Sequence, residues 1–375
     1  MQQNLRIPGP TPIPPQVAEA LARPMINHRG PEFAALLGRV TERLQHFFQT
    51  AQPVLGFPSA GSGAMEAAIV NSFAPGDEVL AVSIGVFGNR FATIAETFGL
   101  RVTRLEAPWG RAADPGEVAR RLGALPNAKG VLLTHNETST GVTNDLRALA
   151  QAIRAERRDA LILVDAVSSL GCVDLQMDAW DVDVVFTASQ KGWMVPPGLA
   201  MLALSARGWE AAERAALPRF YWDVRAARKS LEKGQTPYTP AVNVYVGLDV
   251  ALEMMRAEGR EAIFARHHRV AELVRSRARG MGLALFADPA HASDTVTAIR
   301  VPEGVDGKAL TKALREREGV VIAGGQDRLE GHIIRVGHLG YVHEPEVAAC
   351  MDALERQLAA LGYRAPVASG EAQRA

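Results

Sequence analysis

The sequence has few cysteines, no long apolar run and no excess of charge, and each of these shortages disfavours a class of protein. Cys172 and Cys350 are the only cysteines among 375 residues and form no CxxC pair, which argues against a disulfide framework or a zinc site. No apolar stretch approaches the roughly 18 residues of a membrane helix, and the proline-broken start lacks the apolar core of a secretory signal. The formal net charge is zero, so neither nucleic acid nor an anionic membrane is indicated as a partner. We expect a soluble cytoplasmic protein.

Lysine is also scarce, which shortens the search for a catalytic amine. Lysine and arginine together number 41, but only six are lysines, at positions 129, 191, 229, 233, 308 and 312. Lys191 alone ends an apolar run that is typical of a buried strand, in DVVFTASQKGWMVPPG. Partial desolvation there favours the neutral amine that attacks carbonyl groups. The simpler alternative is a loop lysine that reaches solvent.

Short apolar runs alternate with amphipathic stretches over the first two thirds of the chain. The helical stretches include one that Asp114 and Pro115 would begin, as N-cap and first residue. The apolar runs lie at 78–83, 101–107, 129–135, 160–166 and 183–189. This order predicts an α/β fold with a mostly parallel central sheet and flanking helices. Ligands of such sheets bind beyond the carboxyl ends of the strands.

The pattern changes after Pro240, and the change divides the predicted fold. Residues 1–15 are interpreted as an extended N-terminal arm and residues 16–244 as the large domain. Residues 245–365 begin with a long helix and continue as a smaller α+β domain. Residues 366–375 are small and polar, and a disordered tail is predicted there.

Asp165 adds a second candidate to Lys191. It ends the run ALILVDA, 26 residues before Lys191, so the two residues are expected at the ends of neighbouring strands. Pyridoxal 5'-phosphate requires an anion at its ring nitrogen, because the protonated ring is the electron sink. An aspartate and a lysine so placed can address opposite sides of one flat ring, whereas an aspartate alone after a strand is more often a cap or turn residue.

A glycine-rich turn and an aromatic residue complete the pattern. The segment SAGSGAMEAAI opens a helix whose free N–H groups, with the Ser62 hydroxyl, favour an anion. It has neither the P-loop nor the GxGxxG signature, which disfavours a nucleotide. Phe87 follows the strand at 78–83 and is a candidate for stacking on a ring. A plain helix start and a core phenylalanine are the structural alternatives.

Taken in order, these motifs resemble those of the fold-type I, class V aminotransferases. The closest resemblance is to the alanine/serine–glyoxylate aminotransferase group, and it spans nearly the whole chain. The matching segments are PGPTPIP, MINHRGPEF, SAGSGAMEA, HNETSTGV, VDAVSSLG, SQKGWMVPPG, YTPAVNVY and IIRVGHLG. The resemblance implies a homodimer with shared active sites that binds pyridoxal 5'-phosphate and moves an amino group between amino acids and 2-oxo acids in a ping-pong cycle.

The resemblance also implies a role for individual residues. Lys191 would bind the cofactor covalently and shuttle the proton, and Asp165 would pair with the ring nitrogen. Phe87 and Val167 would cover the two ring faces, and Thr138 would lie at the phenolic oxygen. The implied phosphate site comprises Ser62, Gly63, Ala64 and Gln190, with Thr239 contributed by the second subunit. The implied substrate site comprises Arg335, which binds the carboxylate, with Gly9, Thr138, His28 and Arg29 around it.

The chain departs from the family pattern at three of these places. Several relatives have tryptophan where Phe87 stands and histidine or threonine where Ala64 stands, which alters the phosphate contacts and the pocket width. Thr236 occupies the place of a tyrosine that reaches the partner's site in some members. A dicarboxylate substrate such as aspartate would need a second cation, for which His28, Arg29, Arg225 and Arg228 are candidates.

Alanine or serine as donor, with glyoxylate or pyruvate as acceptor, is the predicted substrate set, and aspartate is the alternative donor. A cysteine desulfurase is disfavoured because Cys172 and Cys350 both lie in patterns typical of buried core positions. A non-catalytic assembly subunit is disfavoured because Asp165, Lys191 and Arg335 are all present.

Overall fold

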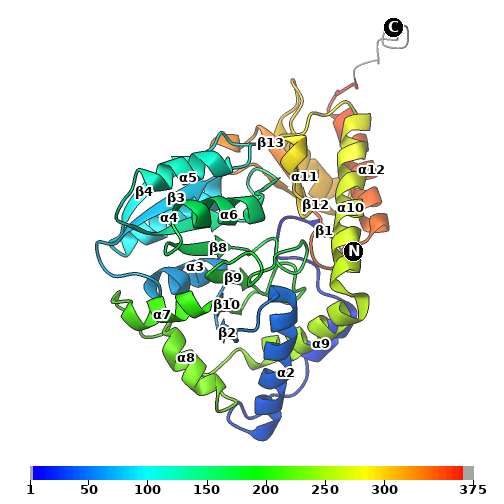
Figure 1. Cartoon of the computed structure of the whole chain (residues 1–375). Helices are drawn as coiled ribbons and strands as arrows, with labels where there is room; N and C mark the ends of the chain where they lie inside the picture. The colour runs from blue at the N-terminus through cyan, green and yellow to red at the C-terminus, as the bar shows by residue number, and fades with distance from the viewer. Residues whose placement is uncertain (1–2, 366–375) are drawn as a thin grey trace.

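Seven short strands pair into one central sheet in the computed structural model, which describes residues 3–365. The strand order is β2-β10-β9-β8-β5-β3-β4, and β10 alone runs antiparallel to its neighbours. This confirms the predicted α/β fold with a mostly parallel sheet (Figure 1). The strands are β2 (Val54–Phe57), β3 (Glu78–Ser83), β4 (Arg101–Glu106), β5 (Ala128–Thr134), β8 (Leu161–Asp165), β9 (Val184–Ala188) and β10 (Ala200–Leu204).

Helices cover both faces of this sheet because successive strand residues point to opposite sides. In β3, Val79 and Ala81 pack into one apolar cluster, while Leu80 and Val82 pack into another. The first cluster contains residues of α3 (Gly61–Val70), α4 (Val86–Thr97), α7 (Ala206–Arg214) and α8 (Val224–Leu231). The second contains residues of α2 (Pro31–Phe48), α5 (Pro115–Gly123), α6 (Leu146–Glu156) and α9 (Val242–Glu258). Asp114 caps α5 as predicted, accepting a 2.7 Å hydrogen bond from the Glu117 backbone N–H.

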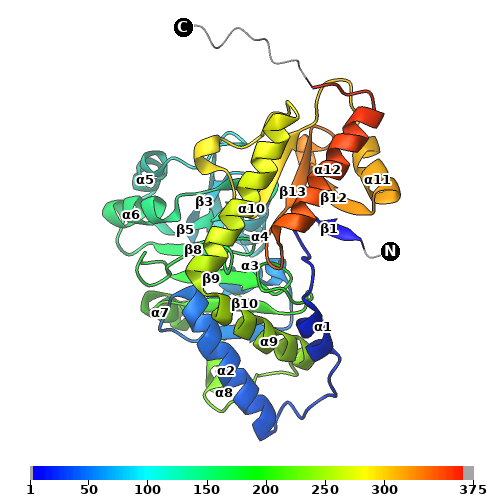
Figure 2. The same cartoon turned by 90° about the vertical axis from the view of Figure 1, so that its right-hand side faces the viewer.

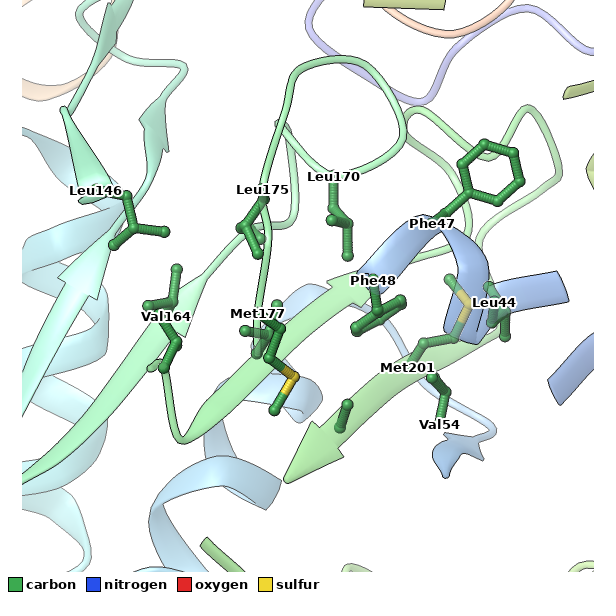
Figure 3. Packing of buried hydrophobic residues seen from close by; sticks show 14 of the residues in the cluster. Leu44, Phe47, Phe48, Val54, Leu146, Val164, Leu170, Leu175, Met177 and Met201 are labelled. Carbon is green, nitrogen blue, oxygen red and sulfur yellow. The ribbon is translucent and has the colours of Figure 1, made fainter. Parts of the chain in front are cut away.

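The second cluster also supports the turn that carries Lys191. Figure 3 shows part of this cluster, in which Phe47 and Phe48 of α2 lie together with strand residues such as Met201 and, farther across the sheet, Val164. Trp193, fully buried, stacks on Phe48 at 6.1 Å between ring centroids. Its indole N–H donates to the Thr187 hydroxyl at 3.0 Å. The residue two places after Lys191 is therefore anchored in the core.

A four-stranded sheet of order β1-β12-β13-β11 forms the second unit, beside the first (Figure 2). Its strands are β1 (Asn4–Arg6), β11 (Val296–Arg300), β12 (Val320–Gly324) and β13 (Ile333–Gly337), and its helices are α10 (Arg260–Gly280), α11 (Gly307–Arg317) and α12 (Glu344–Ala360). The N-terminal arm joins this sheet, because β1 pairs in parallel with β12.

The division into domains stays a prediction, and the packing gives α9 a place on the large side. The apolar residues of α9 contact α1 (Pro15–Leu21) and α2, and the apolar cluster of the small unit begins at Val270 in α10. The predicted tail at 366–375 lies outside the described residues. Within residues 3–365, no helix combines the length and the apolar character that a membrane crossing requires. The remaining short elements are β6 (Asn136–Glu137), β7 (Val142–Thr143) and the 3-10 turns Pro289–His291 and Asp327–Leu329.

Candidate active site

The carboxyl ends of two neighbouring parallel strands bring Asp165 and Lys191 to the same edge of the central sheet. β8 ends at Asp165 and β9 ends three residues before Lys191. Both side chains line one cavity, as the sequence predicted for strand-end residues. The other residues that line it are Ala60, Gly61, Ser62, Met65, Phe87, Arg90, Asn136, Thr138, Val167, Ser168 and Gln190.

The N-terminal arm holds the Lys191 side chain inside this cavity. The Lys191 amine donates a hydrogen bond to the Pro8 carbonyl oxygen, and the Thr11 hydroxyl donates to the Lys191 carbonyl oxygen at 3.0 Å. Burial lowers the pKa of the Lys191 amine to about 8, although the charge of Asp165 acts in the opposite direction. The neutral, nucleophilic amine is therefore accessible near physiological pH.

Gly9 lies directly against that side chain. A Cβ at Gly9 would lie 2.7 Å from both Cδ and Nζ of Lys191, and the backbone φ of +119° is one that glycine adopts readily. The family resemblance implies that Gly9 closes over the substrate carboxylate; in the structure its backbone packs against the Lys191 side chain.

Asp165 is a buried carboxyl, and among the described residues its side chain accepts a single hydrogen bond. Its Oδ1 accepts from the Val167 backbone N–H at 2.9 Å, and the residue is 3% exposed. Burial raises the pKa of Asp165 to about 7, and the charge of Glu137 adds to this effect. A cationic group placed against Asp165 would stabilise the ionised carboxylate by ion pairing.

The N-terminus of α3, where an anion site was predicted, lies at the cavity, but only part of the predicted phosphate set lines it. Ser62 does line it, as does its neighbour Gly61, which was not predicted. Gly63 faces Ser59 and Trp222, where a Cβ would lie 2.0 and 2.8 Å from their nearest atoms. Ala64 is buried in the apolar core, and its backbone N–H donates to the Ala60 carbonyl oxygen within the helix.

Gln190, Phe87, Val167 and Thr138 all line the cavity, as predicted. Gln190 is adjacent to Lys191, and its buried Oε1 has no hydrogen-bond partner among the described residues. Val167 lies against Gly61, where a Cβ would approach its Cγ2 to 3.1 Å. The contact with Val167 therefore leaves little room for a side chain at the start of α3.

Arg335 reaches the site from the middle of β13, in the small unit. Its Nη1 donates to the Thr138 carbonyl oxygen and to Gln326 Oε1, both at 3.0 Å, and its Nε donates to the Gly324 carbonyl oxygen at 2.8 Å. Arg335 is 6% exposed, and burial lowers its pKa to about 10. It is thus a fixed, buried cation directly behind the cavity wall formed by Thr138.

The remaining predicted residues lie away from the cavity of their own chain. Thr239 is exposed, and the Thr236 hydroxyl donates to the Tyr238 carbonyl oxygen at 2.7 Å. Arg29 donates to Gln235 Oε1 at 2.9 Å and to the Thr236 carbonyl oxygen at 2.7 Å, so it braces this segment. His28, next to Arg29, is half-buried and does not line the cavity.

The comparisons with known proteins agree with this geometry. Residues 6–343 match the family model described as aminotransferase class-V. The chain belongs to the class-V aminotransferase family.

Three curated relatives span almost the whole chain. A protein named soluble hydrogenase, small subunit, from Synechococcus sp. is 43% identical over 96% of this chain and 94% of its own. An L-aspartate–glyoxylate aminotransferase from Paracoccus denitrificans is 40% identical over 99% and 95%. A serine–glyoxylate aminotransferase from Hyphomicrobium methylovorum is 37% identical over 98% and 92%.

Among solved structures, the alanine–glyoxylate aminotransferase from Nostoc sp. superposes with a TM-score of 0.91. Its identity is 32%, and the match covers 96% of each chain. This likeness confirms the fold-type I architecture.

This class-V aminotransferase uses pyridoxal 5'-phosphate, and the site fits that cofactor. The amine of Lys191 and the buried carboxyl of Asp165 line the same cavity, and the backbone N–H groups at the start of α3, the Ser62 hydroxyl and the Gln190 amide N–H are donors suited to a phosphate. Phe87 and Val167 provide apolar contacts for a ring.

Both cysteines are buried, and burial raises the pKa of each thiol to about 12. Neither lines the cavity, and both are fully buried among the apolar residues, which confirms their expected place as small core residues. A nucleophilic thiolate at the site, as a desulfurase would need, is absent from the described residues.

Two charged residues of the site were missed by sequence reasoning. Arg90 lines the cavity, and a signal for it exists, because it follows Phe87 by three residues on one helix and so shares its face. Glu137 is fully buried and accepts from the backbone N–H groups of Phe87, Gly88 and Ser139 and from the Ser139 hydroxyl, at 2.7–3.2 Å. No local pattern distinguishes it from a solvent-exposed turn carboxylate.

Proposed function

We propose that this aminotransferase moves the amino group of a small L-amino acid, alanine or serine, to glyoxylate or pyruvate. The observation that carries the proposal is the position of Arg335, a buried arginine bonded to the carbonyl oxygen of Thr138 in the wall of the Lys191 cavity. One guanidinium matches the one carboxylate that all four of these compounds possess. The relatives named serine–glyoxylate and alanine–glyoxylate aminotransferases support the same choice.

The residues divide the work between binding and proton transfer. Arg335, held on the Thr138 carbonyl, orients the substrate carboxylate so that the Cα proton faces Lys191. The Lys191 amine, with its lowered pKa, would take that proton from Cα and deliver it to the cofactor's carbonyl carbon in the same half-reaction; in the second half it would reverse both transfers. The bound cofactor supplies an electrophilic carbonyl and an electron-withdrawing ring. Asp165 supplies the charge that keeps the ring nitrogen protonated.

Aspartate is the second candidate donor, and the relative named L-aspartate–glyoxylate aminotransferase favours it. Within this chain, three of the four predicted second cations, Arg225, Arg228 and Arg29, make contacts elsewhere. Arg225 pairs with Asp223 at 2.9 Å, and Arg228 lies over the Trp209 ring at 4.7 Å. Arg29 is bonded to the 235–237 segment. These contacts favour the smaller donors.

Aromatic residues and Thr239 support the homodimer that we propose. Phe220 is 78% exposed, and Tyr221 and Tyr238 stack beside it with ring centroids 5.1 Å apart. An apolar surface of this kind is typical of a protein interface. Thr239 lies one residue beyond it and would complete the cofactor site of the second subunit. Two free, buried cysteines suit the reducing cytoplasm, which we propose as the compartment.

The relative named as a hydrogenase subunit raises the alternative of a non-catalytic member of the family. The retention of Lys191 and Asp165 in one cavity, with Arg335 bonded to Thr138 in its wall, supports catalysis instead. Within residues 3–365, no group of three or more His, Cys, Asp or Glu side chains is placed to hold a metal ion.

A half-reaction panel tests the proposal. The purified protein, saturated with pyridoxal 5'-phosphate, is mixed with alanine, serine or aspartate, and loss of its yellow absorbance is followed. We expect rapid bleaching by alanine or serine and recovery with glyoxylate or pyruvate. Rapid bleaching by aspartate alone would favour the second candidate. The Lys191→Ala variant is the control, since it lacks the borohydride-reducible linkage; a wild type that takes up no cofactor would refute the assignment altogether.

A further inference from the structure

Arg90 is a charged residue of the cavity that neither the predicted site nor the proposed cycle uses. It lies on the first turns of α4 and is exposed at the mouth of the cavity. Its guanidinium carbon is 4.8 Å from the centre of the Phe87 ring. Its Nη1 donates to the Ser62 hydroxyl at 3.4 Å, so the arginine faces the start of α3.

The charge of Arg90 is not neutralised by its own surroundings. Among the described residues, no carboxylate lies within ion-pair distance of its guanidinium. Burial is the main cause of the raised pKa of Asp165 and of the lowered pKa of Lys191; the positive charge of Arg90 opposes the first shift and adds to the second, so it acts on the interior of the cavity. Contact with the Phe87 ring orients the guanidinium plane while leaving N–H donors free.

The anion site next to Arg90 otherwise lacks a full positive charge. The α3 N-terminus offers backbone N–H groups and a partial helix charge. Ser62 and Gln190 add only neutral donors. Lys191 is the other basic side chain of the cavity, and it is reserved for the carbonyl carbon of the cofactor. A phosphate dianion in this place would be left without a cationic partner from the cavity residues of this chain, apart from Arg90.

We propose that Arg90 binds the phosphate group of the cofactor, closing the anion site formed by Ser62 and the start of α3. The inference rests on the cofactor assignment and adds a residue to it. The phosphate, not a second substrate carboxylate, is the ligand because Arg90 contacts Ser62 at the phosphate turn. Arg335, the substrate arginine, is instead bonded to Thr138, Gln326 and the Gly324 carbonyl.

A comparison of two ligands tests this role directly. The cofactor-free protein and its Arg90→Gln variant are titrated with pyridoxal 5'-phosphate and with pyridoxal, which differs by the phosphate alone. We expect Arg90→Gln to weaken pyridoxal 5'-phosphate binding by about tenfold to a hundredfold, the range for a hydrogen bond to a charged group. Pyridoxal binding should change less than about twofold, because the missing partner is the phosphate.

Two further variants keep the test decisive. Arg90→Lys retains the charge without the planar fork and should recover part of the affinity. Arg104→Gln, on β4, removes a half-buried arginine that is paired with Glu96 at 2.8 Å and does not line the cavity, and it should leave both affinities unchanged. Equal losses for the two ligands, or no loss for either, would overturn the role of Arg90. An unchanged cofactor affinity with slower bleaching by aspartate alone would move Arg90 to the substrate. A wild type that binds neither ligand would refute the cofactor assignment instead.

Discussion

Arg335 donates a 3.0 Å hydrogen bond to the carbonyl oxygen of Thr138, a residue 197 positions earlier in the chain. The bond joins β13 of the small unit to the turn after β6, which lines the Lys191 cavity. Arg335, which we propose as the arginine that binds the substrate carboxylate, is therefore positioned by the wall of the cavity. A shift between the two units would move the guanidinium and that wall relative to each other.

Replacing Arg335 by lysine should weaken substrate binding without loss of cofactor. Lysine keeps the charge but cannot offer two parallel N–H groups to a carboxylate. We expect kcat/KM for the amino donor to fall by about tenfold to a hundredfold, mostly through KM. Steady-state kinetics with cofactor content measured by absorbance would show it. Arg300→Lys, an exposed position over Phe286, is the matched control, and an equal loss there would contradict the role.

The rate of cofactor capture by the cofactor-free protein should rise with pH and reach half its maximum near pH 8. Burial disfavours the ammonium form of Lys191, so the reactive neutral amine appears at lower pH than on an exposed lysine, whose pKa is about 10.4. Stopped-flow absorbance with pyridoxal 5'-phosphate measures the profile. The exposed Lys129→Ala change should leave it intact. A midpoint near 10.4 would show that Lys191 is solvated.

Alanine at Gly9 should impair cofactor attachment as well as stability. The new Cβ would collide with Cδ and Nζ of Lys191, and φ is +119°. Gly76 is the matched control, because its φ is +80° and a Cβ there meets nothing within 4 Å. Both variants should lose on the order of 1–2 kcal/mol to backbone strain. Only Gly9→Ala should slow attachment in a reconstitution assay; equal rates would show that the arm moves aside.

Glutamine at Glu137 should destabilise the protein by about 3 kcal/mol. Both carboxylate oxygens accept hydrogen bonds, from three backbone N–H groups and the Ser139 hydroxyl. The amide NH2 of glutamine would replace one of these accepting oxygens, so it would face N–H donors and leave them without an acceptor. Urea unfolding of the cofactor-free protein measures the loss, with Glu210→Gln on exposed α7 as the control. A change below about 0.5 kcal/mol, typical of a surface site, would show that the buried network adapts.

Much of the fold was predictable because its signals are local. The strand pattern of 78–83 and 160–166 and the capping pair Asp114–Pro115 depend on near neighbours in the chain. The sequence pattern did not predict to which of the two units α9 belongs. Its contacts with α1 and α2 assign it to the large unit, and those contacts are tertiary rather than local.

By itself, the sequence determined which residues are available for the chemistry. It also determined that Asp165 and Lys191 lie at one edge of the sheet, because each follows a strand and parallel strands bring their carboxyl ends to the same edge. Tertiary structure alone decided which groups surround Lys191. The Pro8 carbonyl and Gly9 come from the arm and Arg335 from the small unit, each more than 140 residues away in the chain. It also decided that Ala64 turns into the core while Arg90 faces the cavity. Burial and charge act through space, so the pKa of Lys191 depends on contacts that no local pattern records.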